Sequence, residues 1–406
     1  MAEYNNTTSI ICEPTEGEWK IYSNISWWMD GIASPVISSA GLLLNTLAIV
    51  TLTKSKKVES MFFNYLLVCL AIFDNLYLSN GILGAIRKYI IESSYSFDYV
   101  FIKLIFPFRS MVMFCSMYTT IILAFERYNA IKKPMSYKRR ATQKIATSVL
   151  NIVYYIIPVL LSSVLFYLPK FFEFDISLSN ETSEKNNNAH NTSAYQQDYL
   201  IKETSLRKNK SYIFWYSNVL NHIITIVIPL IMLMYLNFGI YLELKMFKKR
   251  QPSSRTKIRD IQMEQKGMKK EDSEKNEQSI MIISLVFMFI LCHSLRAVLN
   301  IQELVNFEWK FKEISNGCAG VKFWAMVLVP FSEFMLLTNS SANFFIYFLF
   351  HNDFRFYLQR GHSTIVSLKS MWAPCKSSNN SFGSNGFEKS NKIEMEDIAE
   401  IHNGFE

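Results

Sequence analysis

The stretch that decides the fold is Ala124-Phe125-Glu126-Arg127-Tyr128-Asn129-Ala130-Ile131, at the end of an apolar segment that begins near residue 101. On an α-helix, spacings of three, four and seven residues return to one face, so Arg109, Met113, Ser116, Thr120 and Arg127 share a stripe. The two arginines would lie about 27 Å apart along the axis, close to the thickness of a hydrocarbon core, about 30 Å. Such arginines usually face a bundle interior or water; the alternative is snorkelling to the membrane surfaces.

The composition points to a membrane protein. Half of the 406 residues are hydrophobic, and they gather in blocks too long for the helices of a soluble core. The net charge of +8 comes from basic residues that flank these blocks, so it argues for a membrane rather than for nucleic acid. The first residues do not show a basic region followed by an apolar region and a cleavage site of small residues, so we expect no signal peptide.

Seven apolar blocks predict an all-α, seven-transmembrane helix bundle, followed by a short amphipathic helix on the membrane surface at 353–358. The predicted spans are 32–53, 61–83, 101–128, 145–168, 213–241, 280–301 and 321–350. We expect three parts: an extracellular glycosylated tail (1–31), the transmembrane domain (32–358) and a disordered cytoplasmic tail (359–406).

Two signals orient the bundle. Lys and Arg gather in the segments 54–60, 129–144 and 243–278, which predicts that these lie in the cytoplasm. The glycosylation sequons in the remaining polar segments are at Asn5, Asn6, Asn24, Asn180, Asn191 and Asn209. Both signals predict an N-terminus outside and a C-terminus inside, as in a multi-pass protein of the plasma membrane.

Glu126-Arg127-Tyr128 at the cytoplasmic end of the third span, with Pro134 seven residues after the arginine, resembles the rhodopsin-like G-protein-coupled receptors. That resemblance covers about residues 32 to 358. Residues 168–174, 292–303 and 337–347 further resemble invertebrate FMRFamide and related neuropeptide receptors. The resemblance implies a peptide ligand, a heterotrimeric G protein, and arrestin and a receptor kinase acting on the tail.

Other classes of function have less support. A receptor for a non-peptide ligand remains the alternative within the class. A transporter or channel would need an inverted repeat or rings of charge, and the two halves of the sequence show no repeat. No HExxH, GxSxG, phosphate-loop or Cys/His metal spacing points to an enzyme.

Polar residues toward the outer ends of the spans predict a ligand site. On the sixth span, His293, Arg296, Asn300 and Glu303 follow a helical spacing. The whole predicted set is Arg109, Met113, His293, Arg296, Asn300, Glu303 and Glu333. Arg109 stands where amine receptors carry an aspartate, which argues against a cationic amine. The alternative is an internal salt bridge from Glu333 to Arg109 or Arg296 that holds the bundle together.

A deeper set resembles the sodium site of the same family, and the cytoplasmic ends resemble its G-protein contact. The sodium set is Asp74, Ser116, Asn339, Ser340 and Asn343, together with Asn45. Its alternative is a hydrogen-bonded packing network between helices. The residues expected to contact the G protein are Glu126, Arg127, Tyr128 and Tyr347. No other cofactor is expected.

The sequence also departs from the family pattern. His293, Leu295 and Phe344 replace a tryptophan and two prolines that are usual in the sixth and seventh spans. Ile102 stands where a cysteine normally pairs with the loop after the fourth span, and that loop has no cysteine. Cys12 and Cys318 are the two cysteines in segments predicted to lie outside, so we expect a disulfide between them.

Overall fold

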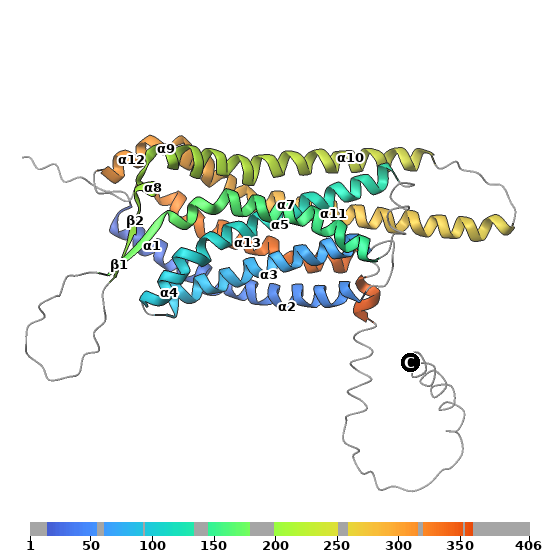
Figure 1. Ribbon diagram of the computed structural model, residues 1–406, viewed down its shortest axis with the longest axis horizontal. Helices are drawn as coiled ribbons and strands as arrows, with labels where there is room; N and C mark the ends of the chain where they lie inside the picture. The colour runs from blue at the N-terminus through green and yellow to red at the C-terminus, as the bar shows by residue number, and fades with distance from the viewer. Residues whose placement is uncertain are drawn as a thin grey trace, which may run out of the picture. The chain divides into compact units, whose positions relative to one another are not determined.

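The computed structural model describes residues 14–54, 61–91, 94–133, 145–178, 199–250, 259–315, 320–351 and 354–359. All of them belong to one compact unit, Met1–Arg360. Within this described part, seven helices are long and apolar enough to cross a membrane: Glu16–Thr53, Phe62–Tyr89, Tyr95–Lys132, Ile152–Phe172, Lys210–Glu243, Ser279–Val305 and Phe323–Phe350. They run side by side (Figure 1), which confirms the predicted all-α bundle.

Most spans are built from more than one helical segment. The first comprises α1 (Glu16–Ser26), a π-helical stretch (Trp27–Ala33) and α2 (Ser34–Thr53), and the second is α3 (Met61–Tyr89). The third comprises α4 (Tyr95–Val100), a π-helical stretch (Phe101–Ile105) and α5 (Phe106–Lys132). The fourth is α7 (Ile145–Tyr167) with a 3-10 extension (Leu168–Phe172).

The remaining spans reach beyond the predicted membrane ends. The fifth contains α9 (Lys210–Tyr212), two π-helical stretches (Ile213–Leu220 and Ile223–Val227) and α10 (Ile228–Arg250). The sixth is α11 (Arg259–Val305) and the seventh is α13 (Phe323–Phe350). The charged segment between the fifth and sixth spans therefore extends both helices, as its mixed charge indicates. Residues 354–359 form the predicted short helix.

The first helix begins earlier than the sequence analysis expected, at Glu16 rather than near residue 32. Its start is a capping box: the Thr15 side chain accepts from the Glu18 backbone N–H, and the Glu18 carboxylate accepts from the Thr15 N–H at 2.7 Å. Lys88 on α3 then holds this helix by donating to Ser26 at 2.6 Å and to Asp30 at 2.9 Å. The expected tail is thus helical from Glu16 onward.

A β-hairpin and two short helices lie at one end of the bundle (Figure 1), which we call the outer end in keeping with the predicted orientation. Strands β1 (Phe174–Leu178) and β2 (Tyr199–Glu203) pair antiparallel, with Ile176 opposite Ile201. The short helices are α8 (Ser205–Lys208) and α12 (Phe307–Ser315). From the sequence alone, only a polar loop is expected between the fourth and fifth spans.

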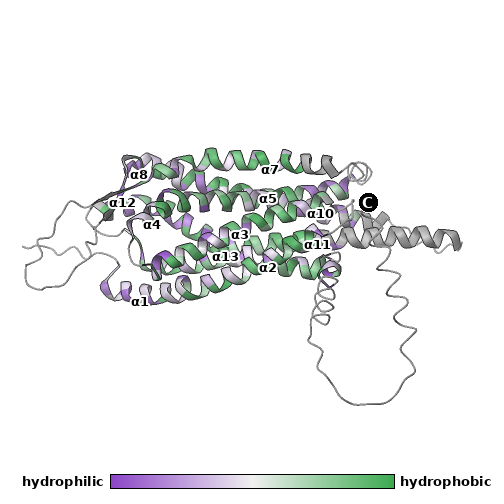
Figure 2. Ribbon diagram, turned by 60° about the horizontal axis from the view of Figure 1, so that its bottom comes forward, coloured by the Kyte–Doolittle hydropathy of each residue, from purple (hydrophilic) through white to green (hydrophobic). Residues whose placement is uncertain are grey.

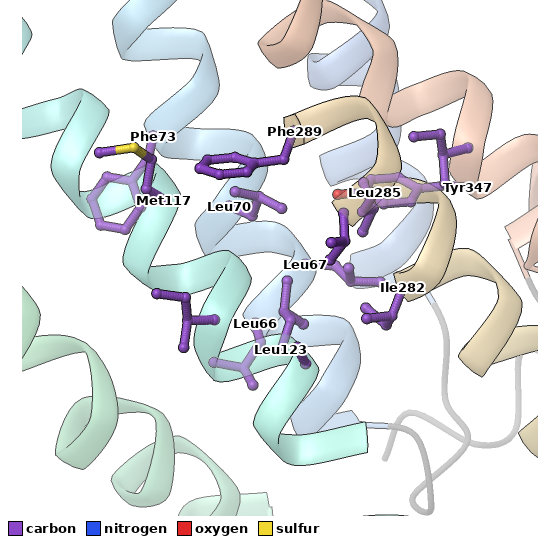
Figure 3. Close-up of a cluster of buried hydrophobic side chains, with 14 of the residues drawn as sticks. Leu66, Leu67, Leu70, Phe73, Met117, Leu123, Ile282, Leu285, Phe289 and Tyr347 are labelled. Atoms are coloured by element: carbon purple, nitrogen blue, oxygen red, sulfur yellow. The ribbon is translucent and has the colours of Figure 1, made fainter. Parts of the chain in front are cut away.

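Hydropathy follows the bundle (Figure 2): apolar residues run along the helices and hydrophilic residues gather toward their ends. The interior packs α3, α5, α11 and α13 around buried leucines and aromatic rings (Figure 3). In that view Phe289 points toward Phe73 and Met117, one layer above Leu67 and Leu285. Large side chains such as Leu43, 75% exposed, and Leu165, 72% exposed, cover the outside, as expected for a surface that faces lipid.

Candidate functional site

Glu333 on α13 lies between two arginines in the outer half of the bundle. Arg109 on α5 donates to Glu333 Oε2, and Arg296 on α11 donates to Glu333 Oε1 at 3.1 Å. Arg109 also donates to the Tyr77 hydroxyl at 3.2 Å and lies over the Tyr77 ring. Each carboxylate oxygen therefore has its own guanidinium, and the internal salt bridge that the sequence left as an alternative is present in the structure.

A cavity of about 50 Å³ adjoins this triad. Four of the predicted ligand residues line it: Met113, His293, Arg296 and Asn300. Its other walls are Ser110, Met117, Tyr167, Lys170, Asn221, Thr225, Ile226 and Leu336. The cavity thus draws on the third, fourth, fifth, sixth and seventh spans, which is the arrangement that a small polar ligand group needs.

Lys170 is the charged residue of this cavity that the sequence did not predict. Its ammonium group donates to Ser110 Oγ at 3.2 Å and lies 5.0 Å from the Tyr167 ring centroid. A lysine at the end of a span usually indicates snorkelling to the surface, so the residue alone gave no signal. Its place directly after Leu168-Pro169, where the α-helix changes to a 3-10 helix, was the available clue.

His293 and Asn300 occupy the α11 side of the cavity. The His293 imidazole is buried and stacks on Phe289, with ring centroids 4.1 Å apart. Asn300 Nδ2 lies 3.4 Å from His222 Nδ1, which joins the sixth span to the fifth. The unusual histidine therefore fills an aromatic position directly under the cavity.

Glu303 does not join the other predicted ligand residues. It forms an ion pair with Lys310 of α12, with Nζ and Oε1 2.7 Å apart. It lines a second cavity, of about 190 Å³, between the outer ends of α11 and α13 and helix α12. The helical face predicted on the sixth span is thus divided between two cavities.

The hairpin is held at its base by a buried carboxylate, Glu173. The Tyr212 hydroxyl donates to Glu173 Oε1 at 2.9 Å, and Arg207 Nη1 lies 3.6 Å from Oε2. The Glu173 carbonyl accepts from the backbone N–H of Thr204 at 3.1 Å. These contacts tie the end of the fourth span to the beginning of the fifth.

A second tie joins the hairpin to the third span. Lys103, one residue after Ile102, pairs with Asp175 of β1 at 3.2 Å. Its hydrogen bond to the carboxylate, together with that from the Ile176 N–H, lowers the pKa of Asp175 from its ordinary value, so the carboxylate stays charged to a lower pH than an unpaired aspartate would. An ion pair therefore stands next to the position where the resemblance would place a disulfide.

The predicted sodium set forms a connected polar cluster below the cavity. Asp74 is completely buried; Ser116 Oγ donates to its Oδ1 at 2.7 Å, and Asn343 Nδ2 donates to its Oδ2 at 2.5 Å. Asn45 Nδ2 donates to the Ser340 carbonyl at 3.0 Å. The packing network that the sequence left as an alternative is therefore formed. Asn339, beside Ser340 on α13, is half-buried.

The cluster also offers oxygen atoms suited to a hard cation. Asn45 Oδ1 is buried and has no hydrogen-bond partner among the described residues. A carboxylate, a hydroxyl and an amide oxygen are ligands that a hard cation such as sodium prefers. Among the described residues, no group of three or more His, Cys, Asp or Glu side chains is placed to hold a metal ion.

At the inner end the bundle is closed around the Glu-Arg-Tyr stretch. Glu126 and Arg127 are buried, and the Arg127 guanidinium lies 3.6 Å from the centroid of the Phe63 ring on α3. Lys132 donates to the Tyr128 hydroxyl at 2.7 Å. A Cβ added at Gly239 would lie 2.7 Å from the Tyr128 ring, so that glycine lets α10 approach α5 closely.

Tyr347 on α13 completes this end. Its ring is fully buried and lies 6.1 Å from Phe354, the first residue of the short helix at 354–359. Its hydroxyl is buried without a hydrogen-bond partner within the described ranges. Phe344, which replaces the usual proline, packs against Phe354 at 5.5 Å. The seventh helix accordingly continues unbroken to Phe350, with Pro330 as its internal proline.

Some predicted residues fall outside the described ranges. These are Cys12, Cys318, Asn5, Asn6, Asn180 and Asn191. The other two sequons predicted to carry glycans, at Asn24 and Asn209, are described and exposed. Asn209 Oδ1 caps α9 by accepting from the Tyr212 N–H at 3.1 Å, which leaves its amide nitrogen for a glycan.

This chain is similar to proteins of known family. The family model described as 7 transmembrane receptor (rhodopsin family) matches residues 44–347. The chain is 25% identical over 355 residues to an FMRFamide receptor of Drosophila melanogaster, covering 85% of this chain and 56% of the relative. It is 23% identical over 274 residues to an FMRFamide peptide receptor of Caenorhabditis elegans, covering 66% and 53% respectively. The chain thus spans little more than half the length of these relatives.

Proposed function

Because the chain belongs to the rhodopsin family of seven-transmembrane receptors, we propose that it is a plasma-membrane receptor for an amidated peptide of the FMRFamide type. In this proposal, binding of the peptide activates a heterotrimeric G protein. The names of two relatives support the ligand class. The family is one of receptors rather than enzymes, so the proposal assigns no catalytic residues.

The observation that carries the proposal is the Glu333 carboxylate held between Arg109 and Arg296 beside a cavity. A peptide ending in Arg-Phe-NH₂ brings one cation, an amide carbonyl and an aromatic ring. Its arginine would take the place of one receptor guanidinium on Glu333. The displaced guanidinium would then be free to donate to the amide carbonyl, so that it still has a hydrogen-bond acceptor after the exchange, although the site gains one positive charge.

Transmission to the G protein would start at the floor of the cavity. His293 stacks on Phe289, which packs toward Phe73 and Met117 in the core (Figure 3). Arg296 lies on α11 together with His293 and Phe289, so a displacement of Arg296 would shift the helix that carries this stack. The buried Arg127 lies over Phe63 in the closed inner end. We propose that opening this end exposes Glu126, Arg127, Tyr128 and Tyr347 to the G protein.

The test is a screen of amidated invertebrate peptides on cells that express the chain, with G-protein activation as the readout. We expect a peptide ending in Arg-Phe-NH₂ to activate at submicromolar concentration. Cells that express Arg127→Ala at equal surface density should bind that peptide and fail to activate. If the wild-type receptor reaches the surface and no amidated peptide in the panel activates it, the proposal fails.

A second candidate ligand is a small non-peptide anion. The positive charge of Lys170 and Arg296 in a cavity of about 50 Å³ favours it. Lys170→Gln separates the two candidates, because it should abolish recognition of a compact anion. An amidated peptide, which has an uncharged C-terminus, should lose far less potency.

We also propose a sodium ion on Asp74 and Ser116 and regulation of the tail by a receptor kinase and arrestin. The buried amide oxygen of Asn45, which has no hydrogen-bond partner among the described residues, supports the sodium proposal. Serines at 363, 367 and 370 and others nearby would add dense negative charge on phosphorylation. Truncation after residue 362 should abolish agonist-driven internalisation, and unchanged internalisation would exclude this regulation.

A further inference from the structure

The second cavity, between α11, α12 and α13, is larger than the first and has no part in the function proposed so far. Its volume is about 190 Å³, against about 50 Å³ for the cavity beside Glu333. Its walls are Leu299, Gln302, Glu303, Asn306, Trp309, Lys310, Gly320, Val321, Ala325 and Val329. It therefore lies at the outer end of the bundle, where a ligand arrives.

The chemistry of the walls selects an uncharged group. The two charged residues neutralise each other, since Lys310 Nζ lies 2.7 Å from Glu303 Oε1. Asn306 uses an amide hydrogen on the Gln302 carbonyl at 2.9 Å. Apart from Gln302 and Gly320, the rest of the lining is leucine, valine, alanine and tryptophan. An apolar side chain fits these walls, whereas a charged group would find no unpaired opposite charge among them.

The shape of the cavity is fixed by a tight turn. Gly320 has a φ of 63°, a conformation that L side chains rarely adopt, and a Cβ there would lie 2.8 Å from the Lys310 carbonyl oxygen. The start of the seventh span is thereby brought against α12. Lys322 lies 5.4 Å from the Trp309 ring centroid and packs that wall from the outside. The hollow is thus bordered on one side by this tight turn and on another by an aromatic ring.

The two cavities adjoin the same turn of α11. Leu299 lines the larger one and Asn300, the next residue, lines the smaller. An extended peptide advances about 3.3–3.6 Å per residue, and a helix with its side chains is about 10–12 Å across. Two residues of peptide span about 7 Å of backbone, so the side chains of the two residues that enter the cavities supply the rest of the reach across the helix.

We propose that the larger cavity binds the N-terminal apolar side chain of the peptide whose arginine lies at Glu333. This inference rests on the proposed function and extends it, because it assigns the part of the ligand that precedes the Arg-Phe-amide. In Phe-Met-Arg-Phe-NH₂ the group is the first phenylalanine, two residues before the arginine. The smaller cavity then recognises the charge of the arginine. The larger cavity distinguishes peptides that share the C-terminal Arg-Phe-amide but differ in the residues before it.

The experiment compares Phe-Met-Arg-Phe-NH₂ with Ala-Met-Arg-Phe-NH₂ on two receptors. On the wild type, the alanine peptide should be weaker by about ten- to hundredfold, the value of burying one large apolar side chain. Ala325→Leu places a larger side chain in the cavity. It should lower the potency of the phenylalanine peptide to that of the alanine peptide and leave the alanine peptide unchanged. Ala40→Leu, on the exposed face of α2, is the matched control and should change neither.

Each outcome decides the question. The assignment is wrong if Ala325→Leu leaves the potency ratio of the phenylalanine peptide to the alanine peptide at its wild-type value. That result would include an equal weakening of both peptides, as expected if the variant only disturbs packing. If Ala325→Leu does not reach the surface, Val329→Ala enlarges the cavity instead, and an N-terminal tryptophan should gain potency relative to phenylalanine; no gain overturns the inference. A wild-type receptor that answers to no amidated peptide would overturn the proposed function first.

Discussion

Replacing Glu333 by glutamine should remove the ability of the receptor to recognise an arginine in its ligand. The carboxylate now accepts from Arg109 on one oxygen and from Arg296 on the other. Glutamine keeps the shape and one acceptor oxygen, but it turns an amide NH₂ toward one of the guanidinium groups. Two donors then face each other, and the charge that a ligand arginine would pair with is gone.

The size of the effect follows from one charge-assisted hydrogen bond. Such a bond is worth about 1.5–3 kcal/mol, which is about 10- to 150-fold in affinity. On the wild-type receptor, replacing the ligand arginine by citrulline should weaken the peptide by that factor. On Glu333→Gln, the arginine peptide should already be weaker by the same factor, and the citrulline exchange should cost little more.

Concentration-response curves for G-protein activation, in cells matched for surface expression, measure both ratios. Glu303→Gln is the control, because Glu303 is also a carboxylate on an outer helix end but pairs with Lys310 at the other cavity. It should leave the arginine-to-citrulline ratio at its wild-type value. If Glu333→Gln keeps that ratio too, at normal expression, Glu333 only holds the two arginines of the receptor in place and our assignment is refuted.

Three further predictions concern other parts of the molecule. Asp74→Asn should abolish any difference in agonist affinity between sodium chloride and choline chloride, measured by competition binding; a persisting sodium effect would locate the ion elsewhere. Glu173→Gln should destabilise the outer end by about 1–3 kcal/mol, since a buried charged partner is lost. Thermal unfolding in detergent measures that loss. Glu203→Gln is the control, because Glu203 also pairs with Arg207 but its side chain is 53% exposed, so this variant should lose less than half as much stability. Equal losses would contradict the special role of Glu173. Cys12 and Cys318 should resist alkylation until the receptor is reduced, and mass spectrometry that finds both alkylated without reduction would exclude the disulfide.

The sequence was sufficient for the bundle because the spans depend on length and hydropathy, which are local properties. It missed the beginning of the first helix although Thr15 and Glu18 spell a capping box, since a polar segment before a span was interpreted as tail. It missed the hairpin because Phe174–Leu178 alternates over only five residues within a polar segment. So short a strand depends on its partner rather than on its own pattern.

The site was harder to predict because its pairings are tertiary. The sequence offered Arg109 and Arg296 as alternative partners of Glu333, and the structure uses both. It grouped Glu303 with the ligand residues by helical spacing alone. The chain leaves α11 at Val305, and α12 then brings Lys310 back against Glu303. No spacing rule within one helix could have included that returning cation.

Because ion pairs attach the hairpin to the bundle, the association and dissociation rates of a ligand should depend on ionic strength. A covalent bridge would hold the hairpin at any ionic strength, and a reductant would release it. Residues 174–211 contain no cysteine, so a reductant has no bond to break there. Salt, in contrast, shortens the reach of the Lys103–Asp175 attraction, from about 10 Å at 0.1 M to about 3 Å at 1 M. The association and dissociation rates of a peptide should therefore rise together with ionic strength, while their ratio changes far less.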